Sequence, residues 1–154
     1  MRIVICIDID DELAPIAAVT RLVHLRGATV DLLHVMDVAE REEFAEAMRP
    51  GLVRPHIREA RGSADASEHT AVEELYRRGS ELLSAAGAAE VMATSRAGRP
   101  ERETVAQLAA SPADLCVLGR RPNWEDVPST GPKSVGRVAR FVTDHAPCAV
   151  LLLR

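Results

Sequence analysis

Aromatic residues are scarce in this 154-residue chain: phenylalanine, tryptophan and tyrosine make up 3% of the sequence, although 47% of it is hydrophobic. Its core must therefore be built from alanine, valine, leucine and isoleucine. Basic residues are too few for a general nucleic-acid-binding face, because 19 lysines and arginines stand against 23 acidic residues and the net charge is -4. The length suits one domain with a substantial core.

Cysteine is also rare. Cys6, Cys116 and Cys148 form an odd set without a Cys-x-x-Cys spacing, so the sequence indicates neither a disulfide framework nor a zinc site. Each lies within or beside an apolar run, which favours free thiols in a reducing compartment. The histidines show no metal-ligand spacing. No apolar run approaches the length of a membrane span, and the first one ends in acidic residues, so we expect a cytoplasmic protein without a signal peptide.

Short apolar runs alternate with segments of helical spacing. The candidate strands are residues 2–8, 28–35, 88–95, 113–119 and 148–154. The candidate helices are residues 11–27, 71–87, 99–111 and 134–147. This alternation predicts a single α/β domain over residues 1–154, with a five-stranded parallel sheet between two layers of helices.

Several details of the helices follow from their spacing. Gly27 offers a stop for the first helix. The inward positions expected in the helix over 71–87 are Val72, Leu75, Tyr76, Leu82 and Leu83. Those expected in the last helix are Val135, Val138, Phe141 and Val142. Residues 36–69 are expected to be a variable, mobile or partly helical insertion, with a short helix near its start and a long loop over residues 49–70.

The first strand is followed by Asp8 and Asp10, and three interpretations of these acidic residues are considered. One is the nucleophile loop of a haloacid-dehalogenase-like phosphatase, with Asp8 as nucleophile, Thr94 or Ser95 on the phosphate and Lys133 as the balancing cation. That enzyme also needs later carboxylates for Mg²⁺, whereas the strand available for them ends in glycine and two arginines. The other readings are a ligand-binding strand end, and acids that cap the first helix.

The second half of the chain carries a more specific pattern. It has an alanine-rich helix, a strand that ends in Gly119, and a last helix that runs into His-Ala-Pro-Cys at residues 145–148 and a final apolar strand. The first half has a strand that ends in Asp8, a helix, and Leu-Leu-His-Val at residues 32–35. In this order and spacing, nearly the whole chain resembles the universal stress protein family.

The resemblance implies a doubly wound sheet with strand order 3-2-1-4-5, of the adenine nucleotide alpha hydrolase-like type. Ligands of such sheets bind beyond the carboxyl ends of the strands, where the winding reverses. Asp8, Val35 and Gly119 would then border one crevice. In family members that bind ATP, an aspartate at the end of the first strand lies close to the adenosine, and Asp8 corresponds to it.

The phosphate loop departs from the family pattern. ATP-binding members carry Gly-x-x-Gly, nine residues, then Gly-Ser or Gly-Thr. Here Gly119 is present, but Pro122 replaces the second glycine and has no N–H to offer. Gly136 follows after thirteen residues instead of nine, and Arg137 stands where a hydroxyl is expected. The resemblance therefore implies weak or no ATP binding.

A substitute phosphate site remains an alternative. Arg120, Lys133 and Ser134 flank the irregular segment before the last helix and could hold an anion at its start. The simpler reading makes Ser134 a plain N-cap of that helix.

The resemblance implies a regulatory or interaction domain in the stress response that acts independently of nucleotides or binds ATP only weakly. The alternative is a nucleotide-binding protein with a modified phosphate loop, with ATP as the candidate ligand and at most slow ATP hydrolysis. Family members pair their last strand with its copy, so we expect a homodimer. Its interface residues would be Val150, Leu151, Leu152 and Leu153.

Overall fold

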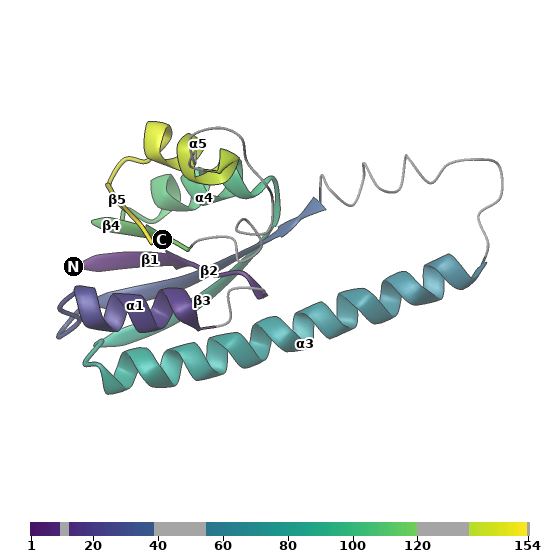
Figure 1. The fold of residues 1–154 in the computed structure, drawn as a ribbon, viewed down its shortest axis with the longest axis horizontal. Coiled ribbons are helices and arrows are strands. Elements are labelled where there is room, and N and C mark those ends of the chain that lie inside the picture. Colours follow the sequence, from purple (N-terminus) through teal and green to yellow (C-terminus); the bar gives the residue numbers. More distant parts are fainter. Residues whose placement is uncertain (10–12, 39–54, 120–135, 154) are drawn as a thin grey trace, which may run out of the picture.

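The computed structural model describes residues 1–9, 13–38, 55–119 and 136–153, of which 55–67 are described only as helical backbone. Its elements are β1 (Arg2–Cys6), α1 (Ala14–Leu22), β2 (Thr29–Asp37), α3 (Pro55–Ala85), β3 (Glu90–Gly98), α4 (Pro100–Ala110), β4 (Leu115–Leu118), α5 (Arg137–His145) and β5 (Ala149–Leu152). All strand pairs are parallel and the order is β3-β2-β1-β4-β5 (Figure 1). The expected fold class and strand order are confirmed.

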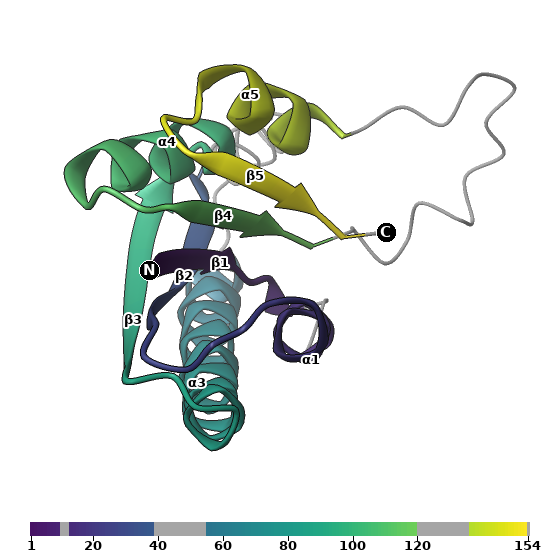
Figure 2. The same cartoon turned by 90° about the vertical axis from the view of Figure 1, so that its left-hand side faces the viewer.

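The sheet is covered on both faces, with α1 and α3 on one and α4 and α5 on the other (Figure 2). Successive side chains of a strand point to opposite faces, so β1 supplies both halves of the core. Ile3 and Ile5 belong to the cluster beneath α1 and α3, whereas Val4 belongs to the cluster beneath α4 and α5. All three are fully buried. The continuous apolar run that predicted a doubly covered strand is explained by this arrangement.

The first two helices differ from the expectation. α1 ends at Leu22, well before Gly27, and Val23 is already extended. Leu25 enters the core from this extended segment, at 2% exposure, and Gly27 serves the turn before β2 with a φ of 75°. The loop expected over residues 49–70 is wrong from Pro55 onward, where α3 begins. A proline is tolerated in a first turn because the N–H it lacks would be unpaired there.

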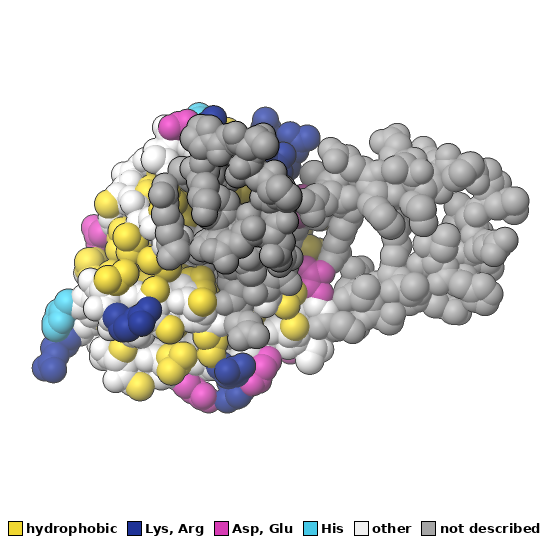
Figure 3. Space-filling view, viewed as in Figure 1, with side chains coloured by type: hydrophobic (Ala, Val, Ile, Leu, Met, Phe, Trp, Pro, Cys, Tyr) yellow, Lys and Arg dark blue, Asp and Glu magenta, His cyan; other side chains and the backbone are white. Residues whose placement is uncertain are grey.

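The inward face of α3 was predicted correctly at Val72, Leu75 and Leu83, but Leu82 is 42% exposed. Figure 3 shows apolar side chains gathered on the surface over α1 and the end of α3. In place of Leu82, the residue that faces the sheet is Gly79, which is buried. Helix α3 can therefore lie unusually close to the sheet at this point.

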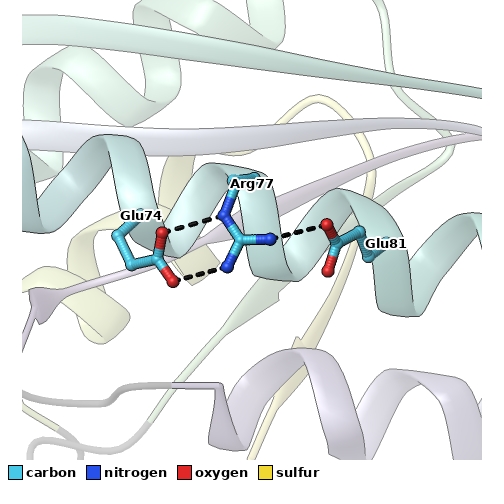
Figure 4. Close-up of polar contacts among 3 residues, drawn as sticks. All are labelled: Glu74, Arg77 and Glu81. Carbon is cyan, nitrogen blue, oxygen red and sulfur yellow. Dashed lines mark hydrogen bonds and ion pairs between the residues drawn. The ribbon is translucent and has the colours of Figure 1, made fainter.

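Helix α3 also carries polar contacts on its two sides. On the sheet side, the Tyr76 hydroxyl donates a hydrogen bond to the carbonyl oxygen of Thr94 at 2.7 Å, and burial raises the pKa of Tyr76. On the solvent side, Arg77 forms a two-pronged contact with Glu74 and a third contact with Glu81 (Figure 4). Exposed pairs of this kind contribute little to stability, so the helix is held mainly by its apolar face.

A buried polar network ties α4 to β2 and β3. Asp31 is 2% exposed, and its carboxylate accepts hydrogen bonds from Thr94 Oγ1 at 2.8 Å and Gln107 Nε2 at 3.0 Å. Arg96 then donates to Gln107 Oε1 at 3.2 Å and to Glu103 Oε2 at 2.7 Å. The buried Asp31 and the half-buried Glu103 therefore both accept hydrogen bonds from the protein, as the burial of a charge requires.

In the last helix, Val142 is buried and Val138 packs against the core, as expected. Phe141 is half-buried but belongs to neither core cluster, and Val135 lies outside the described residues. Phe141 stacks on His145 at a ring-centroid distance of 4.1 Å. Within the described part of the chain, no helix has the length and apolar character needed to cross a membrane.

Replacing Gly79 with leucine should destabilise the protein. A Cβ at this position would lie 2.6 Å from Ile16 Cδ1 and 3.0 Å from Leu32 Cδ1. Overpacking of this kind costs about 1–3 kcal/mol, sometimes more, and urea unfolding would measure it. The exposed neighbour Arg78 provides the control, because Arg78→Leu should change the free energy of unfolding by no more than about 0.5 kcal/mol. Equal effects of both substitutions would contradict the close approach of α3.

Candidate functional site

The winding of the chain reverses between β1 and β4. From β1 the chain leads to α1 on one face of the sheet, and from β4 it leads toward α5 on the other face (Figure 2). The connections therefore diverge at the carboxyl ends of these two neighbouring strands. This is where ligands bind in open α/β sheets.

Three of the predicted site residues meet at this edge. Cys6, the last residue of β1, is paired with Leu33 on one side and Leu118 on the other. Asp8 follows β1 and is exposed, Val35 lies further along β2 and is half-buried, and Gly119 directly follows β4. The strand register therefore brings Asp8, Val35 and Gly119 to the same edge of the sheet.

The start of α5 is the nearest structural counterpart of a phosphate site. Gly136 is its N-cap, with φ -57° and ψ 162°, and as a glycine it offers no side-chain cap. N–H groups of an uncapped first turn favour an anion. Ser134, for which a capping role was expected, lies outside the described residues, as do Arg120 and Lys133.

The start of α4 contributes two buried polar residues that sequence reasoning missed. Glu101 is 6% exposed and Thr104 is 2% exposed. Thr104 Oγ1 lies 3.9 Å from Cys6 Sγ, so this turn packs over the end of β1. Glu101 Oε2 lies 3.7 Å from Arg137 Nη2, which brings it to the start of α5. An acidic residue in a first helical turn is ordinarily exposed, so the sequence held no signal for its burial.

The three cysteines gather on the sheet face beneath α4 and α5. All are free thiols. A hydrogen bond with Cys6, together with burial, raises the pKa of the Cys116 thiol, and burial raises that of Cys148. Protonated thiols are poor nucleophiles and poor metal ligands, so these two residues are structural. Among the described residues, no set of histidine, cysteine and acidic side chains is grouped to hold a metal ion.

The reversed winding places this protein in the class of doubly wound α/β domains, with Asp8, Val35 and Gly119 at the carboxyl edge of its switch point. The sequence profile of the universal stress protein family matches residues 1–154. The chain belongs to this family. Its membership disfavours the phosphatase reading of Asp8.

Solved structures of similar fold agree with this assignment. The universal stress protein UspA from Lactobacillus plantarum is 20% identical, with a TM-score of 0.70 over 100% of this chain and 97% of that one. The universal stress protein from Archaeoglobus fulgidus, in complex with dAMP, is 19% identical, with a TM-score of 0.60 over 100% and 98% of the two chains. A family protein from Arabidopsis thaliana with AMP bound is 17% identical, with a TM-score of 0.61 over 99% and 90%.

These likenesses establish the fold, which is of the adenine nucleotide alpha hydrolase-like type. No curated protein sequence matches the chain.

Gly136→Ala should leave the thermal midpoint nearly unchanged. The backbone of Gly136 suits any residue, and no described atom lies within 4 Å of the position that a Cβ would take. Gly98→Ala is the matched comparison, because Gly98 has a φ of 155° and its Cβ would lie 2.7 Å from Glu103 Cγ. That variant should melt clearly lower in a thermal scan. A large loss of stability in Gly136→Ala would show that this glycine is required by the fold itself.

Proposed function

We propose that this universal stress protein domain is a regulatory binding domain in the stress response, which takes an adenine nucleotide at the carboxyl edge of its sheet and binds ATP weakly. The observation that carries the proposal is the convergence of Asp8, Val35 and Gly119 at the switch point. Structures of relatives that hold AMP or dAMP support a nucleotide as the ligand.

The weak binding of ATP follows from lost phosphate donors. Pro122 cannot supply a backbone N–H, and α5 begins with Arg137 where ATP-binding members have a hydroxyl. A lost hydrogen bond to a charged group costs roughly 1.5–3 kcal/mol. Two such losses correspond to a hundredfold or more in affinity, by about 1.4 kcal/mol per factor of ten.

The alternative is a nucleotide-binding protein with a rebuilt phosphate loop. The start of α5 favours it, because Gly136 has no side chain to cap the helix and an anion there would meet the N–H groups of the first turn. Arg120, Lys133 and Ser134 are the residues of the sequence that could complete such a site. A lysine or arginine would attract phosphate as a flexible charge, but it would not replace the backbone N–H that Pro122 lacks.

Calorimetric titration tests the proposal. Adenosine monophosphate should bind, and ATP should not saturate the protein below about 100 micromolar, a free energy weaker than roughly -5.5 kcal/mol. Asp8→Ala should abolish nucleotide binding. The control is Asp144→Ala, which removes an exposed carboxylate near the other end of α5. Tight ATP binding that is lost in both Asp8→Ala and Lys133→Ala would support the rebuilt loop instead.

We also propose a homodimer that is formed through β5. This strand pairs with β4 and lies at one end of the strand order, so its outer edge has backbone groups without a partner strand among the described residues. Val150, Leu151, Leu152 and Leu153 are half-buried. An apolar edge strand is an aggregation hazard unless it is covered, and an isologous pair of such strands covers both copies at once.

Leu152→Lys should shift the protein toward monomer in sedimentation velocity experiments. A lysine at the edge opposes pairing of two strands because its copy across the two-fold axis carries the same charge. Ala149→Lys, at the exposed start of β5, should have a smaller effect. Circular dichroism would confirm that each variant is folded. A dimer that persists unchanged in folded Leu152→Lys would place the interface elsewhere.

A further inference from the structure

Glu101 is the one buried side chain whose polar atom has no hydrogen-bond partner among the described residues. Its Oε2 atom is sealed from solvent and accepts no hydrogen bond there, and the residue as a whole is 6% exposed. Burying a carboxylate is costly unless hydrogen bonds compensate it. The neighbouring acid of the same helical turn shows the usual solution, because Glu103 accepts a hydrogen bond from Arg96 at 2.7 Å.

Arg137 compensates Glu101 only in part. Its Nη2 atom lies 3.7 Å from Glu101 Oε2, within ion-pair range but too far for a hydrogen bond. The Arg137 side chain is 67% exposed, so water screens much of its charge. A negative charge in a poorly hydrated position therefore remains incompletely paired beside the first residue of α5.

This charge lies at the end of the domain where a nucleotide would place its phosphates. α4 and α5 each precede a parallel strand of the same sheet, β4 and β5, so both helices begin at the carboxyl edge that carries Asp8 and Gly119. The start of α5 attracts anions through its dipole and the N–H groups of its first turn. Glu101, whose Oε2 lies 3.7 Å from Arg137 Nη2 of this turn, would repel them.

We propose that Glu101 sets the number of phosphates that the crevice accepts, and that it selects nucleoside monophosphates against triphosphates. The inference rests on the proposed nucleotide binding. Each further phosphoryl group adds negative charge toward α5. The repulsion between a phosphate and the Glu101 carboxylate is stronger than it would be in water, because the buried carboxylate lies in surroundings of low dielectric constant. A monophosphate keeps its charge near the sheet edge, whereas the outer phosphates of ATP would meet Glu101, which Arg137 compensates only in part.

The test compares the affinities of AMP and ATP within one protein. Glu101→Gln keeps the shape of the side chain and removes its charge. In titrations at low ionic strength with EDTA, so that Mg²⁺ does not neutralise the phosphates, the ratio of the ATP to the AMP dissociation constant should fall by about tenfold or more, roughly 1.4 kcal/mol. Because each ratio is measured within one protein, a change in the folded fraction does not affect it.

Two further variants separate charge from packing. Glu101→Asp keeps the charge and should retain a ratio close to that of the unmodified protein. Glu103→Gln removes a charge from the same turn of α4, but one that is paired with Arg96, and it should also leave the ratio unchanged. An unchanged ratio in Glu101→Gln, with both nucleotides bound, would overturn the role of Glu101 and leave nucleotide binding intact. No binding of either nucleotide to any of these proteins would instead refute the nucleotide-binding function and the inference with it.

Discussion

Strand β1 pairs with β2 on one side and with β4 on the other, and the chain leaves β1 and β4 toward opposite faces of the sheet. The rest of the structure depends on this arrangement. It requires β1 to be apolar on both faces, which Ile3, Val4 and Ile5 satisfy at full burial. It also opens the carboxyl edge between two diverging connections, because no helix can cover both sides of the reversal at once. Fold and candidate site therefore share one cause.

The acids on the α4 side show how the domain treats buried charge. Asp31 is satisfied by Thr94 and Gln107, and Glu103 by Arg96, so these carboxylates hold α4 on β2 and β3. Glu101, a few residues away, has a solvent-sealed oxygen without such donors in the described part of the chain. Helix α4 thus carries Glu103, whose charge is paired and holds the helix on the sheet, and Glu101, whose charge lacks hydrogen-bond donors among the described residues. Such exceptions to local pairing rules are found most often where a protein binds something.

Much of the fold could be predicted from the chain because parallel strands that are covered on both faces leave unbroken apolar runs. The strand order came from the family resemblance, since spacing alone cannot order parallel strands. Helix ends were harder. Leu25 enters the core from an extended segment, so α1 ends at Leu22 although the helical spacing continues. Leu82 was predicted to face inward because it is apolar, but Gly79 occupies the buried position. A pattern of hydrophobic residues does not identify a glycine as a core residue.

The sequence also predicted only part of the candidate site. Asp8, Val35 and Gly119 follow from strand ends and from the family pattern, and the register brings them to one edge. The start of the last helix was predicted too early, because a hydroxyl before a helical pattern is a usual N-cap signal, whereas α5 begins at Arg137 after Gly136. Glu101 was missed because its burial depends on tertiary packing of α4 against the start of α5, and no local signal reports that.

The sulfur atoms beneath α4 and α5 have a consequence for the chemical lifetime of the domain. Peroxides oxidise a thiolate far more readily than a thiol, and the susceptibility of a cysteine follows its thiolate character and exposure. A hydrogen bond with Cys6, together with burial, raises the pKa of Cys116, and burial raises the pKa of Cys148. Both thiols are therefore protonated at neutral pH, and Cys116 is also closed to solvent. Sulfinic or sulfonic groups at this place would force charge into an apolar layer. The fold therefore keeps the sulfur atoms of Cys116 and Cys148 in the form that oxidants attack most slowly.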